Sequence, residues 1–396
     1  MDQLDNISIQ SGIQEFPEEE YQERYQKCRN LMQDHEIDVL VVSDQMNCRY
    51  FTGFKGRTFH RPAFFVLPIE EQPILIVASD FGAQDARSMS WIKKIITYDF
   101  PITHNAIGKA IMGLAKRPKK IGMEIDDTFF GGFRPALSYG MFKRLIDEFK
   151  DVEFCDASRL IWQIRMIKTK REIDCIRRAG TILKKAYSSL FSNIHAGMTE
   201  EEIAASFVQE MVKNGADLPN IGQHGPSAMI IMNASRPTES PNIPTNKALI
   251  KGDLLRIDCG AIFKGYYTDF ACSGIVGEPS QEQLVLWEKV VESVTTEMEK
   301  LKPGIKGDEI NIHWHGVGIY YVEAPFRGTV GKGIPRGTIM ENTHGDLEIQ
   351  AGMTLALEDI IVSTEGDTFH FEEVVEITET GYNNLSHAHR EFFKIN

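Results

Sequence analysis

Residues 254–270 read LLRIDCGAIFKGYYTDF, and the two aspartates of this stretch, Asp258 and Asp269, lie in β-prone runs on either side of a glycine. The midpoint between the two aspartates falls between Phe263 and Lys264. Apolar runs around a glycine predict a strand, a tight turn and a second strand. Residues at equal distances from such a turn face each other, with Cβ atoms about 5 Å apart. The sequence therefore predicts a hairpin that presents two carboxylates side by side.

A second carboxylate pair has the same arrangement in residues 355–375, LALEDIIVSTEGDTFHFEEVV. Glu358 and Glu372 are centred on Glu365, which lies in the turn-like sequence Thr-Glu-Gly-Asp between two β-branched runs. A His-Gly-Val-Gly motif begins at His315, between the two pairs. The sequence thus predicts two hairpins, each with two facing acids, and one histidine between them.

Facing carboxylates need a compensating charge, because like charges that face each other destabilise a ladder. A shared divalent cation supplies this charge most directly. Each acid taken alone would be interpreted as an ordinary solvent-facing strand residue, and it is the five residues together that favour a metal site. Four carboxylates and one imidazole suit Mn²⁺, Fe²⁺, Co²⁺ or Zn²⁺ better than a metal that prefers thiolates. Two such ions about 3.5–4 Å apart can activate a bridging water. The predicted ligands of two divalent metal ions are Asp258, Asp269, His315, Glu358 and Glu372.

Length and charge limit the class of protein. At 396 residues the chain is longer than one ordinary domain, so two domains are expected. The net charge of −13 argues against binding to nucleic acid, which needs a basic face, and against anionic membranes. No run of 18 apolar residues occurs, so no membrane span is predicted. The acidic start of the chain and six scattered cysteines, which we expect to be buried and reduced, predict a cytoplasmic location.

The pattern along the chain predicts an α/β domain over residues 1–162 and an α+β domain over 163–396. In the first domain, helical stripes alternate with continuous apolar runs, which predict buried strands at 37–42, 63–67, 73–78 and 120–124. In the second, helices are expected from residue 168 onward, after the capping box at Thr199–Glu202, and over 281–301. Strand-rich segments, which contain the two acid hairpins, are expected after residue 226 and after residue 301.

In their order along the chain, several short segments resemble the pita-bread metallopeptidase superfamily of methionine aminopeptidase, prolidase, aminopeptidase P and creatinase. The similarity covers nearly the whole chain and is to the prolidase–creatinase branch. It is carried by NCRYFTGF at 47–54, RMIKTKREI at 165–173, KGD at 251–253, GYYTD at 265–269, HGVG at 315–318 and TETGY at 378–382. The resemblance implies a creatinase-like α/β N-terminal domain, a pita-bread catalytic C-terminal domain and a homodimer.

By this resemblance, the four acids and His315 fall on the five metal-ligand positions of the family. One acid of each pair would bridge the two metal ions. In creatinase several of these positions are not ligands, and that enzyme works without metal. The presence of all five residues in this chain therefore implies a metal enzyme.

The chain departs from the peptidase pattern of the superfamily at two imidazoles. A histidine usually lies about a dozen residues before the Lys-Gly-Asp segment, but this chain has none between His224 and His313. A second usually lies seven residues after the motif histidine, where this chain has Val322. Both imidazoles normally bind substrate and stabilise the tetrahedral intermediate. In addition, only ten residues separate Gly304 from His315, about twenty fewer than the family pattern.

The chain also resembles dimethylsulfoniopropionate lyase, a member of the superfamily that likewise lacks the upstream histidine. That enzyme uses an aspartate soon after the motif histidine as its base, and the aligned position here is Tyr321. Tyr321 or Glu323 is accordingly a candidate acid or base, and Glu358 is the predicted ligand that handles protons. His313 would share a strand face with His315 and is a candidate catalytic group.

Three further residues are candidate substrate contacts. Arg236 could hold a substrate carboxylate, and His60 and Arg61 lie in a loop that, in the creatinase branch, reaches the active site of a neighbouring subunit. The function predicted first is dinuclear metal-dependent hydrolysis of a small peptide or amide, such as an Xaa-Pro dipeptide. One alternative is a metal-dependent lyase or non-peptide amidohydrolase acting on a small zwitterion. The other is a non-catalytic binding protein on the same fold.

Overall fold

The structure is a computed structural model, and it describes residues 14–56, 61–99, 104–125, 137–217, 230–233, 243–327 and 347–396. The described residues form two compact units, with Ile164 the last residue of the first and Arg165 the first residue of the second. This division falls inside helix α6 (Ser158–Met166). The boundary predicted between residues 162 and 163 lies two residues earlier.

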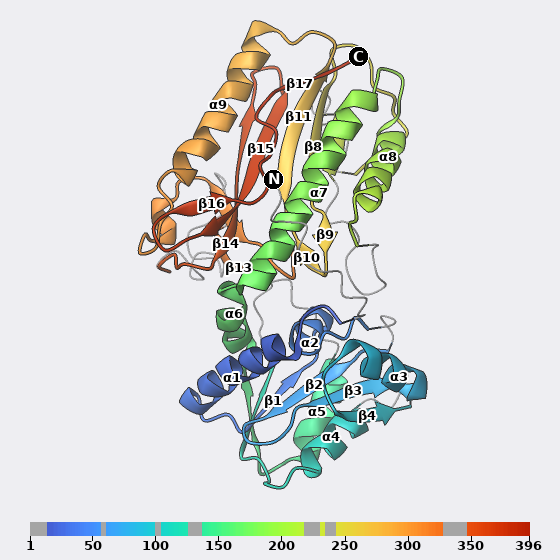
Figure 1. The fold of residues 1–396 in the computed structure, drawn as a ribbon, viewed down its shortest axis with the longest axis vertical. Coiled ribbons are helices and arrows are strands. Elements are labelled where there is room, and N and C mark those ends of the chain that lie inside the picture. The colour runs from blue at the N-terminus through green and yellow to red at the C-terminus, as the bar shows by residue number, and fades with distance from the viewer. Residues whose placement is uncertain are drawn as a thin grey trace. The chain divides into compact units, whose positions relative to one another are not determined.

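A six-stranded mixed sheet in the order β4-β3-β2-β1-β5-β6 forms the centre of the first unit (Figure 1). β1 pairs antiparallel with β2 and parallel with β5. All positions of β1, β2 and β3 are buried, which explains why these strands appear in the sequence as continuous apolar runs. The bounds are β1 Val39–Val42, β2 Phe64–Pro68, β3 Ile74–Ala78, β4 Lys94–Tyr98, β5 Lys120–Met123 and β6 Glu153–Asp156.

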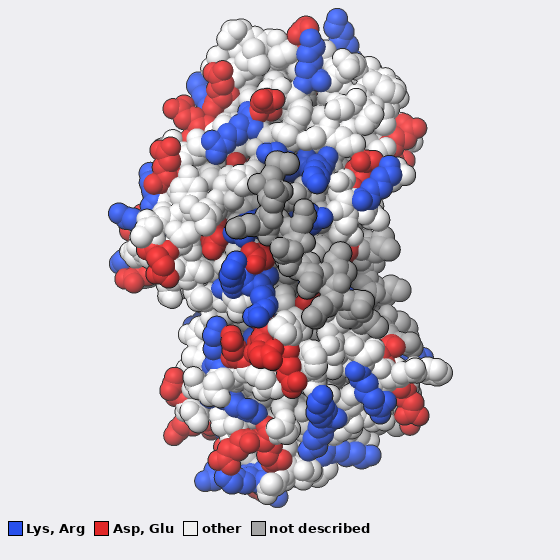
Figure 2. Space-filling model, viewed as in Figure 1, with Lys and Arg blue, Asp and Glu red and all other residues white. Residues whose placement is uncertain are grey.

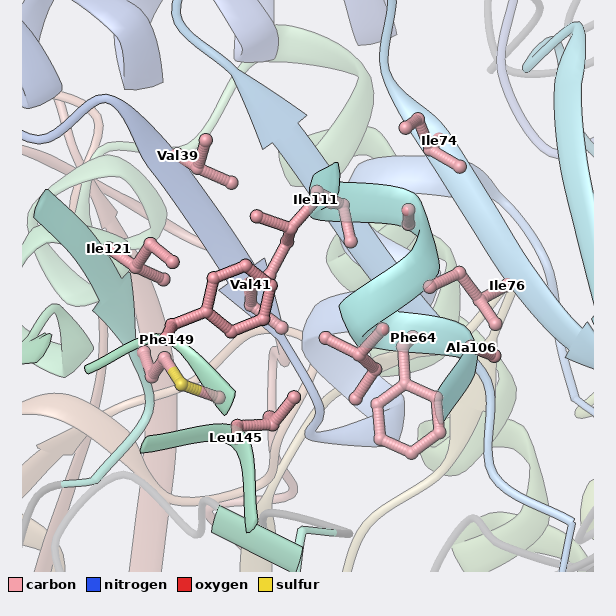
Figure 3. Close-up of a cluster of buried hydrophobic side chains, with 14 of the residues drawn as sticks. Val39, Val41, Phe64, Ile74, Ile76, Ala106, Ile111, Ile121, Leu145 and Phe149 are labelled. Atoms are coloured by element: carbon pink, nitrogen blue, oxygen red, sulfur yellow. The ribbon is translucent and has the colours of Figure 1, made fainter. Parts of the chain in front are cut away.

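Helices cover the faces of this sheet. Figure 3 shows Ala106 and Ile111 of α4, together with Leu145 of α5, packed among apolar side chains of the strands such as Val41 and Phe64. The α/β class predicted for the N-terminal domain is therefore confirmed. Besides α6, the helices are α1 Glu18–Asp34, α2 Gln45–Thr52, α3 Ser79–Met89, α4 His104–Met112 and α5 Tyr139–Glu148.

The second unit contains, in its described residues, a four-stranded sheet, a five-stranded sheet and a two-stranded hairpin. Their orders are β17-β11-β8-β7, β13-β12-β14-β15-β16 and β10-β9. The strands in chain order are β7 Ile230–Asn233, β8 Leu254–Cys259, β9 Ile262–Phe263, β10 Tyr266–Tyr267, β11 Phe270–Val276, β12 His313–Gly316, β13 Glu323–Arg327, β14 Thr354–Val362, β15 Thr368–Ile377, β16 Tyr382–Asn384 and β17 Phe393–Ile395.

Three helices pack on these sheets, as predicted for an α+β domain: α7 Lys170–Asn193, α8 Glu200–Lys213 and α9 Gln281–Met298 (Figure 1). A single 3₁₀ turn, η1 Gly307–Glu309, lies in the short connection before β12. Helix α8 begins at the predicted capping box, in which Thr199 and Glu202 exchange hydrogen bonds. Helix α9 packs along β14 and β15.

Helix α7 is anchored to the strands that carry the first acid pair. Tyr187 is buried, and its hydroxyl lies 3.2 Å from the carbonyl oxygen of Ile257 and 2.9 Å from that of Phe270. These two residues are the chain neighbours of Asp258 and Asp269. The helix therefore holds the main chain of both strands at the level of the acids.

Cysteine and surface features agree with the sequence analysis. All six cysteines are free, and five of them are buried while Cys155 is half-buried. Of the described helices, none is long and apolar enough to cross a membrane. Figure 2 shows acidic and basic side chains interspersed over one face of the molecule.

Candidate metal centre

The first acid hairpin forms, but with a register that differs from the prediction. Asp258 of β8 pairs with Ala271 of β11, and Cys259 pairs with Phe270. Asp269 directly precedes β11, so the two aspartates are diagonal neighbours on one face of the hairpin instead of directly opposed. The predicted partner of Asp258 was therefore wrong by two residues, since Asp258 faces Ala271 instead of Asp269.

The turn explains this shift. Lys264 and Gly265 both have positive φ angles, of 49° and 82°, and Phe263 pairs with Tyr266 around them. A two-residue turn with positive φ at both central positions is the type I′ turn, whose twist matches that of the flanking strands. The turn is thus centred between Lys264 and Gly265, one residue after the predicted midpoint.

The second hairpin has the predicted register. Glu358 of β14 pairs directly with Glu372 of β15. On the other side of β14, His313 of β12 lies opposite Glu358. His315 lies two residues further along β12, and the ring centroids of the two histidines are 5.9 Å apart. Three adjacent strands therefore bring two acids and two imidazoles to one face of the sheet.

The glycines of the His-Gly-Val-Gly motif allow residues 323 and 324 to pass close to the main chain of the motif. A Cβ atom at Gly316 would lie only 2.6 Å from the carbonyl oxygen of Ala324. A Cβ atom at Gly318 would overlap with the carboxylate of Glu323. The motif thus needs glycine at both positions for steric reasons that are independent of its histidine.

All five predicted metal ligands lie in one connected cluster. One group of side chains whose ligand atoms lie within 4.8 Å of one another is Asp269, His315 and Glu372. A second group of this kind contains Asp258 and Glu358, and a third joins His315 to Glu358. Within the first group, Nε2 of His315 is 3.7 Å from Oε1 of Glu372. The sheet of β8 and β11 and the sheet of β14 and β15 contribute two acids each.

The carboxylates of this cluster have strongly perturbed acidities. Burial raises the pKa of Asp269 and of Glu372 well above the usual range, and repulsion between neighbouring carboxylates adds to the effect. Burial also raises the pKa of Asp258. Glu358 differs: burial opposes its ionisation, but a hydrogen bond from His370 and nearby imidazoles lower its pKa to about 2. A bound cation would therefore take the place of the protons that the raised pKa values favour on these acids.

His370 is the site residue that the sequence analysis missed. It is fully buried, and its Nε2 lies 2.7 Å from Oε2 of Glu358. Together with Asp258 and Glu358 it forms the second group that could hold a metal ion. A signal was available, because His370 lies two residues before Glu372 and side chains at this spacing share a strand face.

Comparison with known proteins identifies the family. Residues 174–379 match metallopeptidase family M24, and residues 24–167 match the creatinase/prolidase N-terminal domain. The chain belongs to metallopeptidase family M24. The predicted superfamily, its prolidase–creatinase branch and the two-domain fold class are thereby confirmed, and the chain is a metal-dependent hydrolase of this superfamily.

Similar proteins of the M24 family align over nearly the full chain. An Xaa-Pro dipeptidase from Pyrococcus furiosus is 26% identical over 375 residues, covering 93% of this chain and 99% of the relative. An ectoine hydrolase from Halomonas elongata is 24% identical over 405 residues, covering 96% and 98%. Among solved structures, the prolidase from Pyrococcus horikoshii shares the fold with a TM-score of 0.75 at 23% identity, covering 93% and 99%.

The donor set of this M24 chain fits divalent metal ions. Carboxylate oxygens and imidazole nitrogens are the donors that Mn²⁺, Fe²⁺, Co²⁺ and Zn²⁺ accept. Burying several carboxylates together without a cation is unfavourable, and the raised pKa values of Asp269 and Glu372 are the direct sign of this cost. The cluster therefore has both the chemistry and the charge for metal binding.

The remaining candidate residues of this M24 chain have different surroundings. Tyr321 is half-buried, with its ring centroid 6.3 Å from that of Tyr267. Arg61 is an exposed residue of the first unit, whereas His60 and Arg236 lie outside the described residues.

Glu323 is not available as an acid or base. Its buried carboxylate forms ion pairs with Arg165 and with Lys168, the latter at 2.8 Å. Burial opposes ionisation, but these two cations lower the pKa of Glu323. The suggestion that this residue transfers protons was therefore wrong, because its charge is fixed by two buried partners.

Proposed function

We propose that the protein is a dinuclear metal-dependent hydrolase that cleaves an amide bond in a small peptide or amide. The observation that carries this proposal is the convergence of the five predicted ligands from two sheets into one cluster. The ligands would be Asp258, Asp269, His315, Glu358 and Glu372. Bound divalent ions would polarise the substrate carbonyl and lower the pKa of a water molecule toward neutrality.

Glu358 is the residue of this site best suited to hold and transfer a proton. Its carboxylate lies in the ligand cluster and within hydrogen-bonding distance of two imidazoles, His313 and His370, so it is placed to pass a proton between a metal-bound water and an imidazole. Oε1 of Glu358 lies 3.1 Å from Nε2 of His313. Burial lowers the pKa of His313 and so favours its neutral imidazole, whereas the nearby charge of Glu358 favours the protonated form. His313 would thus act beside Glu358 as a proton-handling group.

The substrate class follows from the relatives and from the two missing imidazoles. Two Xaa-Pro dipeptidases align over 93% of the chain, which supports a dipeptide or similarly small amide. Val322 occupies the position of the second substrate-binding imidazole, and a valine cannot donate a hydrogen bond to a carbonyl oxygen. Tyr321, Arg236 and the His60–Arg61 loop are the remaining candidates for substrate contacts.

An assay on the full chain tests this proposal. The protein is stripped with a chelator, reloaded with Mn²⁺ and assayed against Xaa-Pro dipeptides. Activity should vanish with chelator and return with Mn²⁺. Glu372→Gln should lower kcat/KM at least about 100-fold, since it removes a ligand, whereas Glu365→Gln, an exposed position in the turn of the same hairpin, should leave it unchanged. Metal-loaded protein without any Xaa-Pro cleavage would reject the peptidase form of the proposal.

The second candidate is a non-peptide amidohydrolase or a lyase that uses the same metals on a small zwitterion. The absence of both usual imidazoles favours it, and one full-length relative is an ectoine hydrolase. Ectoine and dimethylsulfoniopropionate therefore belong in the same substrate panel. Release of dimethyl sulfide would identify the lyase, and its absence would remove only that version.

A binding protein without catalytic activity is the remaining alternative. Relatives that lose catalysis would be expected to lose ligands, whereas this chain has all five. Metal analysis that returns less than one equivalent per chain would favour the binding protein. The homodimer and the cytoplasmic location stay predictions.

A further inference from the structure

Two residues beside the proposed metal centre each lie two positions before one of its ligands. Arg256 precedes Asp258 on β8, and His370 precedes Glu372 on β15. Because side chains two residues apart share a strand face, both lie on the face of the ligands. His370 is fully buried and Arg256 is 9% exposed.

The hydrogen bonds that join Arg256 to His370 and His370 to Glu358 have only one possible direction. Nε of Arg256 lies 3.1 Å from Nδ1 of His370 and donates to it. A guanidinium has donors and no acceptor, so Nδ1 must carry a lone pair. The proton of the neutral imidazole is then on Nε2, which lies 2.7 Å from Oε2 of Glu358. The imidazole therefore donates from Nε2 to the carboxylate.

We propose that Arg256 and His370 are positioning residues for Glu358. The guanidinium fixes the Nε2–H tautomer of His370, and this N–H holds Oε2 of Glu358. Oε1 is thereby directed toward Nε2 of His313, at 3.1 Å, on the side where His313, His315 and Glu358 could hold a metal ion. Nη2 of Arg256 is also 3.5 Å from Oδ2 of Asp258. The guanidinium therefore contacts Asp258 of the first hairpin directly and reaches Glu358 of the second hairpin through His370. The inference rests on the proposed metal site.

This arrangement also makes His370 a poor metal ligand, although its position would allow it to be one. A metal-bound imidazole almost always donates its other N–H to an acceptor. The other nitrogen of His370 faces a cationic donor instead, and its Nε2 proton occupies the position that a metal ion would need. The structure thus separates His370 from His315, because Nδ1 of His315 lies 3.0 Å from a carbonyl oxygen, that of Gly316, to which it can donate.

A matched pair of substitutions tests the role of the hydrogen bond. His370→Gln keeps an N–H that can reach Glu358, whereas His370→Leu has no donor. Mn²⁺ affinity of the full chain, measured by chelator competition, should fall about 10–100-fold in His370→Leu and only a few-fold in His370→Gln. His195→Gln, at an exposed position, is the control and should bind as the wild type does. Equal, large losses in both His370 variants would overturn the proposal.

The tautomer can be read in the wild-type protein, so the test does not depend on a variant that folds poorly. With ¹⁵N-histidine labelling and the His370 signals assigned by their loss in His370→Gln, the Zn²⁺-loaded protein should show a protonated Nε2 and an unprotonated Nδ1. Arg256→Gln should increase the other tautomer. Coupling of Nε2 of His370 to bound ¹¹³Cd²⁺ would show a ligand and overturn the proposal.

Failure of the proposed function gives a different result. If the wild type binds no metal, the hydrolase proposal fails, but the tautomer of His370 in the metal-free chain still tests the link from Arg256 to Glu358. If metal binds and the tautomer is the Nδ1–H form, the positioning role fails while the hydrolase proposal stands.

Discussion

At the scale of single residues, the buried ion pairs of Glu323 make a sharp stability prediction. Glu323→Gln would remove the carboxylate that pairs with two buried cations, Arg165 and Lys168. Removal of one partner from a buried pair costs about 3–5 kcal/mol, so the free energy of unfolding should fall by that amount in urea titration. The control is Glu70→Gln, whose partner Lys116 is exposed, and it should be neutral. Equal effects of both substitutions would contradict this account.

The residues of the metal centre differ in how readily they can be predicted from the sequence. Asp258, Asp269, Glu358 and Glu372 stand out because two acids at hairpin spacing need an explanation. His370 was missed because a lone histidine in an apolar strand looks like an ordinary core residue. Its role depends on Arg256, which is far away in sequence and meets it only when two sheets pack together. A pattern along one chain segment does not contain such a contact.

At the scale of elements, the type I′ turn of the first acid hairpin can be tested. Gly265 has φ of 82°, and a side chain in left-handed conformation costs about 1–2 kcal/mol. Gly265→Ala should therefore lower the free energy of unfolding by about that amount and weaken Mn²⁺ binding, because the turn positions Asp269. Lys264→Asn is the matched change and should be neutral or stabilising, since asparagine is favoured at the first position of this turn. A stable Gly265→Ala protein would argue against the observed turn.

The same turn shows the limit of predicting strand register from spacing. The midpoint rule gave the correct pairing of Glu358 with Glu372, where the loop is symmetric about Glu365. It failed for the first pair because backbone conformation at Lys264 and Gly265 sets the centre of the turn. Apolar runs predicted the buried strands of the first unit well, but not β4, in which four of five positions are exposed or only half-buried.

At the scale of the whole molecule, the fold class followed from the alternation of elements and from the family resemblance. The approach of the β8–β11 sheet to β15 did not, because it depends on packing between strands distant in sequence. This packing brings the four acids together. It therefore couples the stability of the second unit to metal and to pH.

Metal binding should release protons. Burial and neighbouring carboxylates raise the pKa values of Asp269 and Glu372 well above the usual range, so protons compete with the metal ion for these ligands. Metal affinity should rise with pH, by up to about tenfold per pH unit for each proton released. Calorimetry of Mn²⁺ binding in two buffers with different ionisation heats should give a positive number of released protons. A value of zero would show that these acids are already ionised.

The stability of the metal-free and the metal-bound forms should respond differently to pH. An acid whose pKa is raised on folding binds more protons in the folded state, so it stabilises the metal-free protein at low pH and this contribution is lost as pH rises through the raised pKa. In the metal-bound form these acids are ionised, as they are in the unfolded chain, so the rising affinity offsets that loss and the acids add no pH dependence. The difference in Tm between Mn²⁺-loaded and chelator-treated protein should therefore widen from pH 6 to pH 8. Glu372→Gln removes one metal ligand and one acid with a raised pKa, so its difference in Tm should be small at every pH. A wild-type difference in Tm that stays constant from pH 6 to pH 8 would contradict the coupling.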